Sequence, residues 1–191
     1  MAVITISRQL GSLGDDVALA IQKRLGYRII GREIINQAAL RARTPEVALA
    51  TIDELGLLGL RPPLKIRMAY HEAVRGVMYE ISNQGSSIII GRAGQVILRD
   101  VPGVFHVKVI APSLLRAERI STSQGITIEC ALQQVIASDQ TRRNYLHRYY
   151  KARWDDPELY DLIVNTAHLT PDQAACIICQ VIKQCDLEPS I

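Results

Sequence analysis

Residues 3–25 read VITISRQLGSLGDDVALAIQKRL, and the order of residue types in this stretch decides the fold. Residues 2–7 are apolar and β-branched, which predicts a short buried strand. Gly11 and Gly14 follow within a few residues and predict a tight turn. From residue 15 to residue 25 the apolar positions repeat at helical spacing, and Gly26 stands where a left-handed residue ends a helix. The sequence therefore predicts a strand, a loop and a helix in direct succession.

The rest of the chain continues this alternation of strands and helices. Further strands are predicted at residues 27–30, 87–90, 105–110 and 162–164, and helices at 33–42, 44–55, 64–84 and from 170 onward. Residues 114–151 have a helical pattern that is rich in Arg and Tyr toward its end, and we expect them to form the mobile part of the molecule. Strands that alternate with helices predict one α/β domain with a parallel sheet.

Composition restricts the class of protein. An apolar share of 48%, a charged share of 21% and a net charge of +3 are those of an ordinary globular protein, and they exclude disordered and fibrous classes. The apolar runs are strand-sized, so no membrane span is expected. The apolar start is too short for a signal peptide, which predicts a cytoplasmic protein with reduced thiols. Cys176 and Cys179 form a C-x-x-C within the amphipathic final helix, where core packing is expected.

The turn between the first strand and the first helix is a candidate phosphate site. A strand that feeds a glycine turn and then a helix brings main-chain N–H groups and the positive end of the helix to one point. The common P-loop adds a lysine and a hydroxyl, but here the lysine position falls on Gly14. A Rossmann fingerprint is matched only by Gly11 and Gly14, with Glu33 about 20 residues on. A plain turn, in which Asp15 and Asp16 complement the helix dipole, is a third interpretation.

Four blocks occur in order along the chain: ITISRQLGSLG at residues 4–14, IIGR at 89–92, Asp139 with Arg142 and Arg143, and WDDPELYDLIVNT at 154–166. This combination resembles the cytidylate kinase-like family over residues 3–182. The resemblance implies the three-layer α/β/α fold of the P-loop nucleoside monophosphate kinases, with a five-stranded parallel sheet. It also implies a helical substrate-side region at 43–84 and a helical lid at 114–153.

The family typically has a P-loop without the lysine, as this chain does. Leu13 departs from the family pattern because a glycine is usual there, and Gly31 departs because an aspartate commonly precedes the substrate-side helix. Both departures bear on phosphoryl transfer more than on the fold.

The resemblance implies ATP and Mg²⁺ as cofactors, with no metal ligands assigned to the protein. Arg142 and Arg143 on the lid would close over the phosphates as catalytic residues, and Asp139, one helical turn away, would orient one of them. The residues expected to bind the cofactor are Arg8, Gln9, Gly11, Ser12, Leu13, Gly14, Asp15 and Asp16.

The acceptor is expected at the carboxyl edge of the sheet. Arg92, together with Gly91, directly follows a buried strand and matches the arginine that contacts the acceptor monophosphate in related kinases. Arg32 and Arg116 are further candidates for substrate binding, and Arg119 matches a lid arginine as Arg116 does.

The expected function is ATP-dependent phosphoryl transfer to a nucleoside monophosphate, with CMP or dCMP suggested by the family. The alternative is a catalytically weak or inactive nucleotide-binding module that acts through a protein partner. The aromatic and basic residues at 148–160 leave stacking on RNA bases open as a minor alternative. The apolar residues 55–60 are a candidate homodimer contact.

Overall fold

The computed structural model describes residues 2–42 and 64–185. Its centre is a five-stranded sheet in the order β2-β3-β1-β4-β5, in which every paired strand runs parallel to its neighbour. The predicted parallel sheet is therefore confirmed. The strands are β1 (Val3–Arg8), β2 (Arg28–Ile30), β3 (Ser87–Ile90), β4 (Val104–Ile110) and β5 (Leu162–Asn165).

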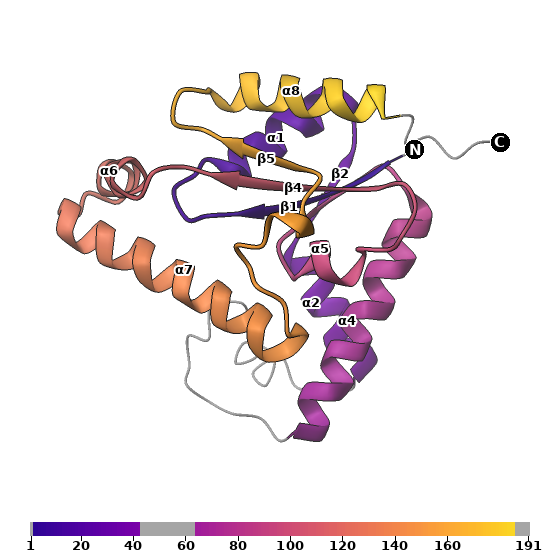
Figure 1. The fold of residues 1–191 in the computed structure, drawn as a ribbon. Coiled ribbons are helices and arrows are strands. Elements are labelled where there is room, and N and C mark those ends of the chain that lie inside the picture. The colour runs from indigo at the N-terminus through magenta and orange to yellow at the C-terminus, as the bar shows by residue number, and fades with distance from the viewer. Residues whose placement is uncertain (1, 43–63, 186–191) are drawn as a thin grey trace.

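Helices cover both faces of the sheet and complete a three-layer α/β/α fold (Figure 1). Helices α1 and α8 pack on one face, and α2, α4 and α5 lie on the other (Figure 1). Helices α6 and α7 form the region expected as a lid, and α7 runs from α6 toward α4. The helices are α1 (Gly14–Leu25), α2 (Arg32–Ala42), α4 (Leu64–Gln84), α5 (Gly94–Ile97), α6 (Ser113–Gln124), α7 (Ile128–Tyr150) and α8 (Pro171–Gln184), with a 3₁₀ turn η1 (Pro157–Leu159).

Strand β1 is buried on both sides because it lies in the middle of a covered parallel sheet. Ile4 and Ile6 are fully buried against α1 and α8. The opposite face of β1 carries the buried polar residues Thr5 and Ser7. The sheet therefore turns an apolar face to α1 and α8, whereas its opposite face is partly polar at β1, where Thr5 packs against Gly94 of α5.

The predicted helix at 44–55 and the predicted dimer contact at 55–60 lie outside the described residues. Within the described ranges, no helix has the length and apolar character that would let it cross a bilayer.

Candidate phosphate and acceptor site

The loop between β1 and α1 opens onto a cavity of about 380 Å³. Leu13 is the N-cap of α1 with φ 62°, and its side chain accepts no hydrogen bond from the helix. The first main-chain N–H groups of an α-helix have no acceptor within the helix, and the helix dipole makes this end positive. Most loop residues from 8 to 16 line the cavity, together with Arg119, Ile120, Ser123 and Gln124 of α6 and Arg142 of α7. The cavity thus places open amides and guanidinium groups around one space.

Side chains within the loop fix its shape. Ser12 is completely buried, and its hydroxyl donates to the carbonyl oxygen of Gln9 at 2.8 Å. The Oε1 atom of Gln9 accepts from the amide of Ala111 at 3.0 Å, just after β4. The hydroxyl of Thr166, after β5, donates to the carbonyl oxygen of Ser12 at 2.8 Å. Gln9 and Ser12 were both predicted as cofactor contacts. The Gln9 side chain holds the loop to the sheet edge, and the Ser12 hydroxyl closes a hydrogen bond within the loop.

Arg8 and Gly14 face each other across the base of the loop. A Cβ atom on Gly14 would lie 2.4 Å from Cβ and 2.8 Å from Cγ of Arg8. The P-loop pattern G-x-x-x-x-G-K has glycine at its first position and lysine at its seventh. Here Arg8 occupies the first position and Gly14 the seventh, so the large cation and the glycine have exchanged places. The sequence shows this exchange when both positions are compared with the P-loop pattern. A lysine at residue 14 would place its Cβ against Arg8, which explains its absence.

Arg116 is buried, and its guanidinium is surrounded by protein acceptors. It forms a two-point ion pair with Asp139, with Nη2 to Oδ2 at 2.9 Å and Nη1 to Oδ1 at 3.2 Å. Its Nε donates to the carbonyl oxygen of Ala111, and Nη1 also donates to that of Leu10. A Cβ on Gly11, which has φ 76°, would lie 2.7 Å from the carbonyl oxygen of Arg116. Arg116 therefore packs beneath the loop, although it was expected to contact the substrate.

Asp139 pairs with Arg116, whereas the sequence suggested that it orients Arg142 or Arg143. The pKa of Arg143 is raised mainly by its hydrogen bond to Asp155, and the charge of Asp139 adds to this shift, so an orienting role of Asp139 stays a prediction. Both oxygens of Asp139 bind a residue 23 positions away on α6. Helical spacing suggested Arg142 and Arg143 because residues three and four apart are neighbours on a helix. Arg142 donates to the hydroxyl of Ser138, one turn earlier on α7.

Arg119 contacts the loop from the other side of the cavity. It donates to the carbonyl oxygen of Gly11 at 3.2 Å and to the carbonyl oxygen of Thr166 at 2.7 Å. Partial burial lowers the pKa of its guanidinium. Arg119 thus lines the phosphate cavity while it ties α6 to the loop after β5.

Arg143 is held by Asp155, in the loop that follows α7. The Nε of Arg143 donates to Oδ2 of Asp155 at 2.6 Å, and Nζ of Lys108 on β4 lies 3.2 Å from Oδ1. Burial acts to raise the pKa of Asp155, but the hydrogen bond from Arg143 and the charge of Lys108 outweigh it and hold the pKa below its ordinary value. One carboxylate therefore links the lid helix to the sheet.

Lys108 was not predicted as a functional residue. Its ammonium is buried, donates to the carbonyl oxygen of Trp154 at 2.8 Å and lies 4.5 Å from the centre of the Trp154 ring. Burial lowers the pKa of Lys108, and the neighbouring Asp155 partly opposes this shift. A lysine within a strand that is apolar except for His106 was the available signal, because lysine is almost never fully buried unless it is paired.

Gly91 and Arg92 lie at the carboxyl end of β3, as expected. Gly91 has φ 71°, Arg92 has φ 58°, and the side chain of Arg92 is buried. The amide of Gly91 donates to the carbonyl oxygen of Ile6, which places this turn directly beside β1. The main chain of Arg32 begins α2, but its side chain lies outside the described part of the structure.

A second cavity, of about 360 Å³, lies between α4 and the last turns of α7. His71 stands among aromatic rings, with ring centres 4.4 Å from Tyr149 and 5.7 Å from Tyr150. Glu72, Arg75 and Arg148 line the same cavity. Aromatic rings therefore form the floor of this cavity, and charged side chains form its rim. No local sequence signal predicts this cavity, because two helices that are distant in the chain form it.

The parallel sheet, the loop at the amino end of α1 and the flanking arginines define a P-loop kinase fold. The family model for the cytidylate kinase-like family matches residues 3–168, and the chain belongs to this family. It is 28% identical over 173 residues to a cytidylate kinase of Ignicoccus hospitalis, a match that covers 90% of this chain and 94% of that protein.

A further curated relative is matched over part of its length, and solved structures agree with the fold. The chain is 30% identical over 172 residues to a uronate isomerase of Corynebacterium glutamicum, but the match spans only 33% of that protein's length and 87% of this chain. Among solved structures, an uncharacterized protein from Eubacterium ventriosum superposes with a TM-score of 0.74 at 20% identity, covering 96% of this chain and 99% of that one. Shikimate kinase from Acinetobacter baumannii superposes with a TM-score of 0.55 at 14% identity, covering 98% and 96%.

Proposed function

We propose that the protein transfers a phosphoryl group from ATP to a nucleoside monophosphate, with CMP or dCMP as the acceptor. The observation that carries the proposal is the cavity at the amino end of α1, where main-chain amides meet Arg8, Arg119 and Arg142. Phosphoryl transfer depends mainly on positioning and on neutralising the phosphate charge, and arginine binds phosphate oxygens with two parallel hydrogen bonds. The relation to cytidylate kinases supports the choice of acceptor.

Arg8 takes the part of the missing lysine in this proposal. Its Cβ occupies the space that a side chain at residue 14 would need. Its Nε donates to Asp15 in the first turn of α1 at 3.1 Å, so the guanidinium lies near the open amides. Arg142, from the lid, supplies a second cation to the same cavity.

Mg²⁺ would be carried mainly by the ATP phosphates and water. Within residues 2–42 and 64–185, no three His, Cys, Asp or Glu side chains are grouped to hold a metal ion. Asp15 and Asp16 line the cavity, and Mg²⁺ in kinase sites typically needs only one or two carboxylates beside the phosphates. The residues present therefore fit Mg²⁺ that enters with the nucleotide, and the ion would neutralise phosphate charge.

The cavity at His71 supports an acceptor that carries a base. Tyr149 follows Arg142 by seven residues on α7, which corresponds to about 10 Å along the helix. An aromatic floor stacks on a base. Glu72 can accept from an amino group, and Arg75 or Arg148 can donate to ring acceptors, which matches the pattern of cytosine. In this arrangement the phosphate lies toward Arg142 and the base toward Tyr149.

The test is to mix the protein with ATP, Mg²⁺ and each nucleoside monophosphate in turn and to measure nucleoside diphosphate. We expect product with CMP or dCMP, and a Tyr149→Ala variant should raise KM for the acceptor while ATP affinity stays unchanged. Absence of product with every acceptor would overturn the proposal of an enzyme. Tight ATP binding by calorimetry without turnover would favour the non-catalytic module, which the absent lysine and the non-glycine Leu13 also favour.

A further inference from the structure

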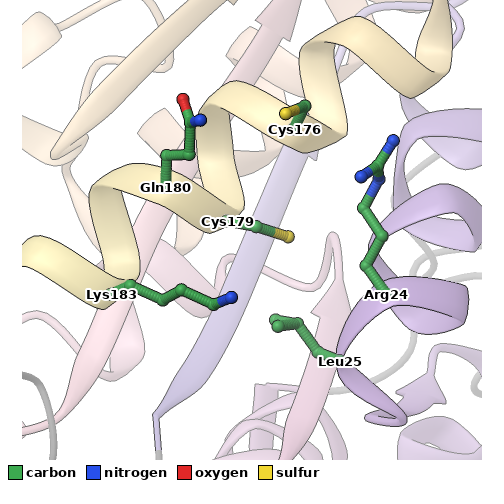
Figure 2. Close-up of a pocket in the computed structure, with 6 residues that line it drawn as sticks. All are labelled: Arg24, Leu25, Cys176, Cys179, Gln180 and Lys183. Carbon is green, nitrogen blue, oxygen red and sulfur yellow. The ribbon is translucent and has the colours of Figure 1, made fainter.

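A groove between α1 and α8 combines two thiols with two cations. It has a volume of about 300 Å³ and lies on the face of the sheet opposite α4 (Figure 1). Figure 2 shows that α8 contributes Cys176, Cys179 and Lys183, and that Arg24 and Leu25 project from the end of α1. The two walls thus come from segments that are about 150 residues apart in the chain.

The cations are positioned by the packing of the two helices. Nη2 of Arg24 lies 3.4 Å from the carbonyl oxygen of Asp172 and donates to it, so the guanidinium is tethered to α8. Burial raises the pKa of Cys179, and the charges of Arg24 and Lys183 partly oppose this shift. Both cations line the same groove as Cys176. Reactive cysteines in proteins are found in such electropositive, partly exposed surroundings.

The two thiols of the groove differ in accessibility. Cys179 is 6% exposed and packs in the apolar layer between the helices and the sheet, and this burial raises its pKa. Cys176, one turn earlier, is half-buried and lines the groove. Core packing, expected for both, therefore describes Cys179 better than Cys176. Cys130 and Cys185 are exposed and do not line the groove, so they serve as internal controls.

We propose that Cys176 is a modification site that forms a mixed disulfide with small anionic disulfides, for which oxidised glutathione is the probe. The Cys176 thiol loses its proton to water, and its thiolate attacks one sulfur of the disulfide. A new sulfur–sulfur bond forms, the old one breaks, and the leaving glutathione thiolate takes the bonding electron pair and a proton. Arg24 and Lys183 attract the carboxylates of the incoming molecule.

This site is independent of the proposed phosphoryl transfer. The groove lies at the last turn of α1, whereas the phosphate loop precedes its first turn, and 12 helical residues separate the two by roughly 18 Å. Modification is therefore expected to leave ATP affinity unchanged, and either proposal can fail without the other.

The experiment incubates the reduced full chain with oxidised glutathione and follows the adduct at each cysteine by mass spectrometry of peptides. We expect the Cys176 peptide to gain one glutathionyl group several-fold faster than the Cys130 and Cys185 peptides. Cys176→Ser should remove this adduct, and Cys179→Ser should keep it. In guanidinium chloride the four cysteines should react at similar rates, because the groove no longer exists. The same ranking of rates in folded and unfolded chains would overturn the proposal.

Charge is tested with variants at exposed positions. Arg24→Glu combined with Lys183→Glu should slow the reaction with oxidised glutathione about tenfold and accelerate the reaction with cystamine, a cationic disulfide. The matched control, Lys65→Glu combined with Arg99→Glu, changes net charge equally outside the groove and should leave both rates near those of the parent chain. Equal effects of the two double variants would show that only net charge matters and would also overturn the proposal.

Discussion

Because Arg8 and Gly14 have exchanged the positions of cation and glycine, Gly14→Ala should destabilise the chain, whereas glycine to alanine in a helix normally stabilises it. Gly14 begins α1, and replacing glycine by alanine within a helix normally stabilises it by up to about 1 kcal/mol. Here the new Cβ would lie 2.4 Å from Cβ of Arg8, whereas carbon atoms pack at about 3.5–4.0 Å. The position of Cβ is fixed by the backbone, so no rotation of the Arg8 side chain relieves the contact. We therefore expect Gly14→Ala to destabilise the chain by about 1–3 kcal/mol.

The assay is a thermodynamic cycle of four proteins. Gly14→Ala in the parent chain should lower Tm by about 2–12 °C, at roughly 2–4 °C per kcal/mol for a protein of this size. In an Arg8→Gly background both clashing atoms are gone, and the same substitution should become neutral or stabilising. The coupling energy between the two positions should exceed about 1 kcal/mol. An equal loss of Tm in both backgrounds would refute the argument from packing.

The same pair of residues separates stability from nucleotide binding. Arg8→Gly should weaken ATP affinity about tenfold to a hundredfold, which corresponds to the loss of a charged hydrogen bond worth about 1.5–3 kcal/mol. Adding Gly14→Lys to Arg8→Gly restores the order of the common P-loop and should recover part of this affinity. Unchanged ATP affinity in Arg8→Gly would show that the arginine supports the loop without binding phosphate.

Three further outcomes are expected. Asp139→Asn leaves the buried guanidinium of Arg116 without its anion and should destabilise the chain by about 3–5 kcal/mol in denaturant titrations, and a loss below about 1 kcal/mol would contradict a buried ion pair. Burial raises the pKa of Tyr160 to about 12 in the folded chain. The stability linked to its protonated hydroxyl is therefore complete below about pH 10 and is lost as pH rises toward 12. Tyr160→Phe should flatten this fall of stability between about pH 10 and pH 12, and an unchanged slope would exclude Tyr160 as its source. At Leu13, with φ 62°, glycine should be more stable than alanine by about 1 kcal/mol in thermal denaturation, and the reverse order would show that the backbone there is unstrained.

The strands and α1 could be predicted because their signals are local. A β-branched run, two glycines and an amphipathic repeat occur within residues 3–25, and each element depends mainly on its own residues. The pairing of Arg116 with Asp139 could not be predicted in this way, because it depends on how α6 packs against α7. Spacing along α7 suggested a partner for Asp139 on its own helix, but buried charges pair wherever the tertiary structure brings opposite charges together.

The candidate site also combines residues that a local motif predicts with residues that only the tertiary structure brings together. Arg8, Gly11 and Gly14 form a continuous motif, so the sequence places them at the turn directly. Lys108 and Trp154 come from separate segments and meet only because β4 and the loop after α7 converge. A charged residue inside an apolar strand signals a buried partner, yet it does not identify that partner.

Asp155 explains how the proposed lid could release an arginine at low cost. In the described structure its carboxylate binds both Arg143 and Lys108, at 2.6 Å and 3.2 Å. The Asp155 side chain is 47% exposed, so its ion pair with Arg143 contributes only about 0–1 kcal/mol, and movement of Arg143 toward a phosphate costs little. Lys108 remains in place because β4 holds it beneath Trp154, so the carboxylate keeps one cation throughout. Arg143 would then move from the Asp155 carboxylate to a phosphate, while Lys108 continues to neutralise the charge of Asp155.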